Sequence, residues 1–138
     1  MMTWETFEHQ ADIGVRGFGD TLEEAFSGAA TALIATMCDP ATIVTTQSVE
    51  IDCDAPDLEI LLVDWLNALV YQMAVNHLIF KHFDINIKDH QLHAQASGEP
   101  VSFLRHKPAV EIKGATFTEL KVRRQPHGRW LAQCVIDV

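Results

Sequence analysis

The chain has 138 residues, of which 48% are hydrophobic and 21% are charged, and its formal net charge is −9. This composition excludes an intrinsically disordered chain, and the length predicts one domain spanning residues 1–138. No unbroken apolar run approaches the roughly 20 residues that cross a bilayer. The first residues lack the basic and apolar regions of a secretory signal. We therefore expect a cytoplasmic globular protein without a membrane segment.

The charge is unevenly distributed along the chain. Residues 1–77 contain 13 acidic residues and one basic residue, whereas residues 78–138 contain nine basic and six acidic residues. An acidic surface of this size repels a phosphate backbone, so we expect no direct binding of nucleic acid. The same surface could dock onto a basic protein, such as an enzyme that handles nucleic acid, or it could serve solubility alone.

Two segments have the apolar periodicity of helices, and the others alternate like strands. Apolar residues recur three and four positions apart in the helical segments, which indicates faces that pack into a core. Alternation with one polar face is typical of antiparallel sheet. Strands before, between and after two main helices predict an α+β fold of mostly antiparallel sheets packed with those helices. In chain order the predicted elements are strands 3–8 and 13–18, a helix at about 21–37, strand 48–53, a helix at about 55–75, and strands 83–88, 91–96, 115–123 and 129–138.

Local signals predict where several of these elements begin and end. Thr21 opens a T-x-x-E capping box at the start of the first helix. Asp54, with Pro56 two positions later, is the predicted N-cap of the second helix. A hairpin turn is expected at residues 88–90. Residues 97–109 show no clean periodicity, which predicts a long loop, and long loops often carry function.

The three cysteines, Cys38, Cys53 and Cys134, form no close pair in the sequence. An odd number of separated cysteines predicts neither a disulfide framework nor a zinc knuckle. Cys53 and Cys134 lie among alternating apolar residues, so we expect buried thiols there and no catalytic cysteine.

Oxygen donors near the two ends of the chain form one candidate site. His9 and Asp12 are three residues apart between two predicted strands, where a turn could bring them together. Asp137 and Val138 offer a side-chain carboxylate and a terminal carboxylate or main-chain oxygen. Together with Asp12 they form a donor set suited to Ca²⁺ or Mg²⁺. From the residues alone, an ordinary solvated terminus with a surface acid is the favoured interpretation.

The other polar candidates are weaker. Lys113 lies on the polar face of a short alternating segment, where a lysine is usually solvated. His90 and His93 are three apart and would point to opposite faces of a strand, so they are rejected as a metal pair. The sequence contains no phosphate-binding loop, nucleophile elbow or H-E-x-x-H motif. The residues by themselves therefore indicate no reaction.

Six fragments, taken in order, carry a resemblance to a known family. They are residues 9–14 (HQADIG), residues 61–67 (LLVDWLN), Gly98-Glu99, His106, residues 112–116 (IKGAT), and Trp130 with the final Asp137-Val138. In this order and at these separations they resemble the archease family over almost the whole chain. Gly114 stands where that family usually has alanine, which could loosen the strand beside Lys113.

The resemblance implies an accessory protein of an RtcB-type RNA ligase in tRNA splicing and RNA repair. It implies that the protein is not an enzyme, and that it promotes guanylylation of the ligase from GTP and its repeated turnover. It also implies a divalent metal, most often calcium and alternatively Mg²⁺ or Mn²⁺, held by Asp12, Asp137 and Val138. Lys113 matches the important lysine of the family. His9, Glu99 and His106 are the remaining candidates for activating the partner.

Two other functions stay open at this point. Carboxylates, a lysine and histidines could support metal-dependent hydrolysis, although no nucleophile or base has a supporting motif. An older proposal for the archease family is a chaperone-like modulator of RNA-modifying enzymes. That role requires exposed apolar surface, and the two helical stripes are expected to be used by the core.

Overall fold

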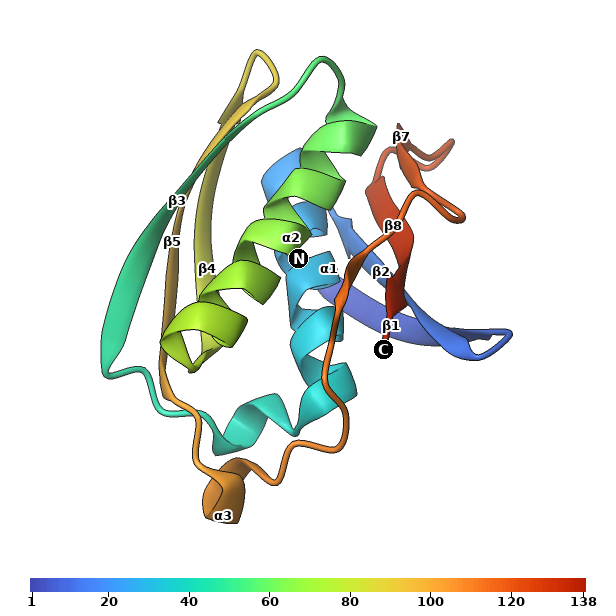
Figure 1. Ribbon diagram of the computed structural model, residues 1–138. Coiled ribbons are helices and arrows are strands. Elements are labelled where there is room, and N and C mark those ends of the chain that lie inside the picture. Colours follow the sequence, from blue (N-terminus) through green and yellow to red (C-terminus); the bar gives the residue numbers. More distant parts are fainter.

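Two antiparallel sheets enclose two long helices in the computed structural model, which describes residues 1–138 (Figure 1). The larger sheet has the order β1-β2-β8-β6, with β7 also paired to β8, and the smaller sheet has the order β3-β5-β4. Every strand pair is antiparallel, so the predicted α+β class is confirmed. The elements in chain order are β1 (Thr3–His9), β2 (Asp12–Gly19), α1 (Leu22–Met37), the 3₁₀ turn η1 (Pro40–Thr42), β3 (Gln47–Asp54), α2 (Leu58–Asn76), β4 (Leu78–Lys88), β5 (Gln91–Pro100), α3 (Phe103–His106), β6 (Gly114–Ala115), β7 (Lys121–Arg124) and β8 (Trp130–Asp137).

The first helix, α1, begins at the predicted cap. The hydroxyl of Thr21 accepts a hydrogen bond from the Glu24 N–H at 3.1 Å, and the Glu24 carboxylate accepts one from the Asp20 N–H at 2.9 Å. The helix packs so closely on β2 that a Cβ added at Gly17 would lie 2.0 Å from the carbonyl oxygen of Ala25. Only glycine at that position allows this approach.

The second helix, α2, begins three residues later than predicted. Asp54 is the last residue of β3 and pairs with Gln91, so its backbone belongs to the sheet ladder. The N-cap is Asp57, whose carboxylate accepts from the Ile60 N–H at 2.8 Å. By length and apolar composition α2 could cross a membrane. In this fold it lies between the two sheets, and its fully buried Trp65 donates to the Phe26 carbonyl oxygen at 3.2 Å.

The strand boundaries differ from the prediction in three places. β4 starts at Leu78 and not at residue 83, because an irregular register between Phe80 and His82 interrupts the alternation. β5 continues to Pro100, and the short helix α3 occupies part of the segment expected to be a loop. The predicted strand 115–123 is two strands, β6 and β7, separated by a turn in which Glu119 has a φ of 55°.

The hairpin between β4 and β5 agrees with the prediction. Asp89 and His90 both have positive φ, 51° and 62°, which is the geometry of a tight two-residue turn. The turn between β7 and β8 contains Gly128 with a φ of 94°, a conformation that favours glycine.

Candidate functional site

The first candidate residues meet at the turn between β1 and β2. His9 and Asp12 are direct partners in the antiparallel register, and the turn between them contains Gln10 with a φ of 55°. Residues directly opposite each other in an antiparallel pair present their side chains on the same face. Val15 is fully buried in the core beside α1, so by alternation His9 and Asp12 belong to the outer face of the larger sheet.

The end of β8 lies next to this turn. Ile13 pairs with Ile136, so the next position in the register sets Asp12 opposite Asp137, where Cβ atoms are typically about 5 Å apart. Asp12 is half-buried and Asp137 is exposed. Like charges opposite each other destabilise a sheet unless a positive charge lies between or beside them. Residues that are 125 positions apart in the sequence thus form one acidic group.

Lys113 is held against the same end of β8 through the backbone. Its N–H donates to the Asp137 carbonyl oxygen at 2.8 Å, and Gly114 pairs with Asp137. The exposed Asn67 of α2 accepts from the Ala115 N–H at 2.8 Å and so fixes β6 from the other side. We did not select Asn67 from the sequence, although it lies in one of the fragments that carry the family resemblance.

The donor chemistry of this end of the sheet suits a hard divalent cation. Asp12 and Asp137 contribute carboxylates, and Val138 contributes main-chain oxygen, which are the donors that Ca²⁺ and Mg²⁺ prefer. No three His, Cys, Asp or Glu side chains cluster so as to hold a metal by themselves. A cation here therefore requires main-chain, water or partner oxygens in addition to the two carboxylates.

Glu99 and His106 lie in a different part of the fold. Glu99 is buried near the end of β5, where Arg105 donates to its two carboxylate oxygens at 2.7 and 2.6 Å. The Val44 N–H donates to the same carboxylate at 2.6 Å, and Nε2 of His106 lies 3.0 Å from it. The Arg105 guanidinium, followed by the Val44 N–H, holds the pKa of Glu99 at about 2, below its ordinary range.

The fully buried His106 side chain completes this network. The Ser102 N–H donates to Nδ1 of His106 at 2.8 Å, so Nε2 carries the proton and donates to Glu99. None of the hydrogen bonds or ion pairs of Glu99 and His106 reaches Asp12, Lys113 or Asp137. The network anchors α3 and the segment after β5 to the segment before β3. Arg105, its central cation, was missed in the sequence because nothing local marks it as the partner of Glu99.

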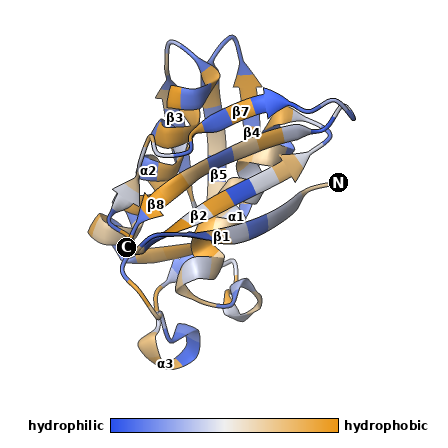
Figure 2. Ribbon diagram, turned by 90° about the vertical axis from the view of Figure 1, so that its right-hand side faces the viewer, coloured by the Kyte–Doolittle hydropathy of each residue, from blue (hydrophilic) through white to orange (hydrophobic).

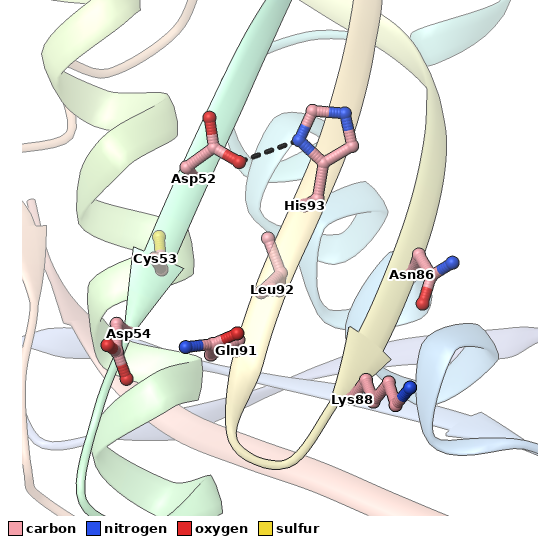
Figure 3. A pocket seen from close by; sticks show the side chains of 8 residues that line it. All are labelled: Asp52, Cys53, Asp54, Asn86, Lys88, Gln91, Leu92 and His93. Atoms are coloured by element: carbon pink, nitrogen blue, oxygen red, sulfur yellow. Dashed lines mark hydrogen bonds and ion pairs between the residues drawn. The ribbon is translucent and has the colours of Figure 1, made fainter.

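A polar hollow on the smaller sheet contains none of the predicted site residues. It has a volume of about 410 Å³ and is lined by β3, β4 and β5 (Figure 3). Nδ1 of His93 lies 2.6 Å from Asp52, and this contact raises the pKa of His93. Burial, followed by the charges of Asp64 and Asp52, raises the pKa of the half-buried Cys53 thiol to about 11. The thiol is therefore protonated and unreactive at neutral pH.

The other two cysteines are buried, as the sequence predicted for Cys134. Burial raises the pKa of Cys134 to about 12 and also raises that of Cys38. All three cysteines are free thiols, and the sequence predicted no disulfide framework.

Comparison with known proteins supports one family assignment. The model of the Archease protein family (MTH1598/TM1083) matches residues 4–138. The protein archease of Pyrococcus furiosus is 39% identical over an alignment of 142 residues, which covers 100% of this chain and 100% of the relative. The protein archease of Methanosarcina barkeri is 36% identical over 140 residues, which cover 98% of this chain and 95% of the relative.

Two solved structures have the same fold. The solution structure of Methanobacterium thermoautotrophicum protein 1598 has a TM-score of 0.77 and 28% identity, with 98% of each chain covered. A crystal structure from Thermotoga maritima, described as an archease and possible chaperone, has a TM-score of 0.64 and 20% identity. The structural alignment covers 97% of this chain and 96% of the Thermotoga chain.

Proposed function

The chain belongs to the archease family, and from that premise we propose that it is a non-enzymatic activator of an RtcB-type RNA ligase. The observation that carries the proposal is the meeting of Asp12, Asp137 and the backbone of Lys113 at one end of the larger sheet. These residues come from three separate segments, which supports a shared functional role more strongly than any one of them does.

The proposed mechanism is electrostatic. Asp12, Asp137 and the main-chain oxygen of Val138 would hold a divalent cation, which when bound would supply positive charge toward phosphate oxygens. Lys113 is exposed and adds a second positive charge on the chain itself. Its backbone bond to Asp137 keeps the main chain of Lys113 beside the acidic group. The site would thereby organise the GTP phosphates or the nucleotide pocket of the ligase during guanylylation.

Asp12→Asn and Lys113→Gln test the proposal, with matched controls on the smaller sheet. Asp84 and Lys81 are exposed residues of β4, so Asp84→Asn and Lys81→Gln make the same charge changes elsewhere. Purified ligase is incubated with GTP and each form, and guanylylated ligase and joined RNA are quantified. We expect activation by the wild-type protein and by both controls. The two site variants should lose about ten- to hundredfold, the value of one charge-assisted contact. If the wild-type protein leaves guanylylation and turnover unchanged, the proposal is wrong.

An apolar groove favours a chaperone-like role as the second candidate. The groove has a volume of about 370 Å³ between α2, α3 and residues 108–112. Phe103 lines it and is 76% exposed, and the neighbouring Leu104 is 89% exposed. The exposed part of this surface comes from α3, and Val70 and the partly buried Met73 at the end of the predicted α2 stripe line the groove beside it. Suppression of the aggregation of unrelated clients, lost in Phe103→Ser, would support this candidate over specific ligase activation.

A further inference from the structure

The edge of the larger sheet carries a local basic segment on an otherwise acidic protein. This segment, residues 121–129, consists of β7, the following turn and Arg129. It contains four Lys or Arg residues and one His, and it contains no acidic residue. We call this segment the basic hairpin. β7 pairs only with β8, so its outer edge is unpaired, and Figure 2 shows it as a hydrophilic strand beside β8.

Three cations of the basic hairpin, Lys121, Arg123 and Arg124, lack the carboxylate partner that every other arginine has, including Arg129 at the end of the hairpin. Arg16, Arg105 and Arg129 each form an ion pair with a carboxylate, those of Glu5, Glu99 and Asp20 respectively. Arg123 and Arg124 are exposed and form no ion pair, and the same holds for the half-buried Lys121. Arg124 only donates through Nε to the Gly128 carbonyl oxygen, which leaves its charge uncompensated.

These three charges lie along an extended backbone. Lys121 and Arg123 belong to one face of β7 and are separated by about 6.7 Å along the strand, while Arg124 belongs to the other face. Val122, between them, packs against the core and fixes the orientation of the strand. Two of the three cations therefore share one face of the edge strand, and the exposed Arg124 lies at the end of the strand on the other face.

The surroundings of these three cations indicate what they bind. None of the large hydrophobic side chains that are exposed in this protein lies within the basic hairpin. A protein interface normally requires apolar or aromatic anchors at its centre, whereas a phosphate backbone requires mainly Lys and Arg. We propose that Lys121, Arg123 and Arg124 form a contact site for the phosphate backbone of a nucleic-acid strand. The net charge of −9 opposes such binding, so the proposal departs from the expectation drawn from the sequence and depends on the local absence of acidic residues in the basic hairpin. This site is independent of the proposed ligase activation.

Lys121→Gln/Arg123→Gln/Arg124→Gln tests the site against a control of equal net charge. The control is Lys81→Gln/Lys88→Gln/Lys107→Gln, which removes three exposed lysines elsewhere, none of which forms an ion pair. Fluorescence anisotropy measures binding of labelled single-stranded RNA and of DNA of the same sequence at about 50 mM salt and at rising salt. Circular dichroism and light scattering verify that all forms are folded and monodisperse.

We expect the wild-type protein and the control variant to bind, and the hairpin variant to bind at least about tenfold more weakly. The salt dependence of the hairpin variant should also be flatter, by about one in log–log slope for each lost phosphate contact. RNA bound more tightly than DNA would indicate additional contacts to the ribose and would assign RNA as the ligand; equal binding would assign the shared phosphate backbone.

Three results would overturn the proposal. The first is no binding by the wild-type protein at the lowest salt, which would leave the cations as protection of an open sheet edge against aggregation. The second is an equal loss in both triple variants, which would show that only the total charge matters. The third is displacement of RNA by polyglutamate at an equal concentration of charge, which would indicate an acidic protein as the partner.

Discussion

At the scale of single residues, the role of Glu99 depends on groups that are distant in the sequence. Its carboxylate accepts hydrogen bonds from Arg105, from the Val44 N–H and from His106. These bonds are strongest when the carboxylate is ionised. The family resemblance selected Glu99 and His106 as functional candidates. In the fold they anchor a loop, and an effect of their mutation on a partner could arise through that loop.

The pKa of Glu99 leads to a prediction about stability and pH. Its folded pKa of about 2 lies below its ordinary value, so the folded state is stabilised above the ordinary pKa. This stabilisation should be lost as the pH falls from about 4.5 toward about 2. Urea unfolding between pH 6 and pH 2.5 should show the loss in the wild-type protein. Glu99→Gln should be less stable than the wild type at pH 6, and the difference should be clearly smaller at pH 2.5, where part of the stabilisation remains.

Glu8→Gln is the control for this experiment, because Glu8 is exposed and forms no ion pair. Its pH profile should follow that of the wild-type protein. An identical pH profile in Glu99→Gln and the wild type would mean that the network of Glu99 does not contribute to acid sensitivity.

At the scale of elements, the sequence predicted the core better than it predicted the boundaries. The apolar stripes of both helices are in the core, and the turn at Asp89 and His90 is where it was expected. Periodicity failed at β4, where Leu78, Ile79 and Phe80 are all buried and so do not alternate. It also failed where a local signal had two readings, as at Asp54, which could end a strand or cap a helix and does the former.

The contact between α1 and β2 is the element-scale feature that we expect to be most sensitive to a single methyl group. The Cβ of Gly17→Ala would lie 2.0 Å from the Ala25 carbonyl oxygen and 2.2 Å from the Ala29 nitrogen, both of them backbone atoms that move only with the helix. Overpacking of this kind costs about 1–3 kcal/mol, and a lower free energy of unfolding in urea should show it. Gly114→Ala should cost less, since only the Asn67 side-chain oxygen is near, at 3.2 Å. Equal losses would contradict the close packing of α1 on β2.

At the scale of the whole molecule, the candidate site exists only in the folded chain. Its parts come from the β1–β2 turn, from β8 and from the segment before β6, and Asn67 of α2 fixes that last segment. The donor types in the sequence suggested Asp12, Asp137 and Val138 as one set, and the family resemblance implied the same grouping. Spacing could not show that Asp12 and Asp137 meet, because their proximity results from the pairing of β2 with β8 across almost the entire chain.

This dependence on the fold predicts that a bound cation stabilises the protein. An unfolded chain cannot hold Asp12 and Asp137 together, so a cation that uses both binds only the folded state and stabilises it by about 2.7 kcal/mol at a hundredfold excess over Kd. For a chain of this size that corresponds to a rise in Tm of about 10 °C. Thermal unfolding in calcium chloride, compared with potassium chloride of equal ionic strength, measures the rise. It should nearly vanish in Asp12→Asn and persist in Asp84→Asn, whose charge is removed from the smaller sheet. An equal rise in both variants would mean that calcium binds elsewhere, and no rise in the wild-type protein would mean that these carboxylates hold no calcium.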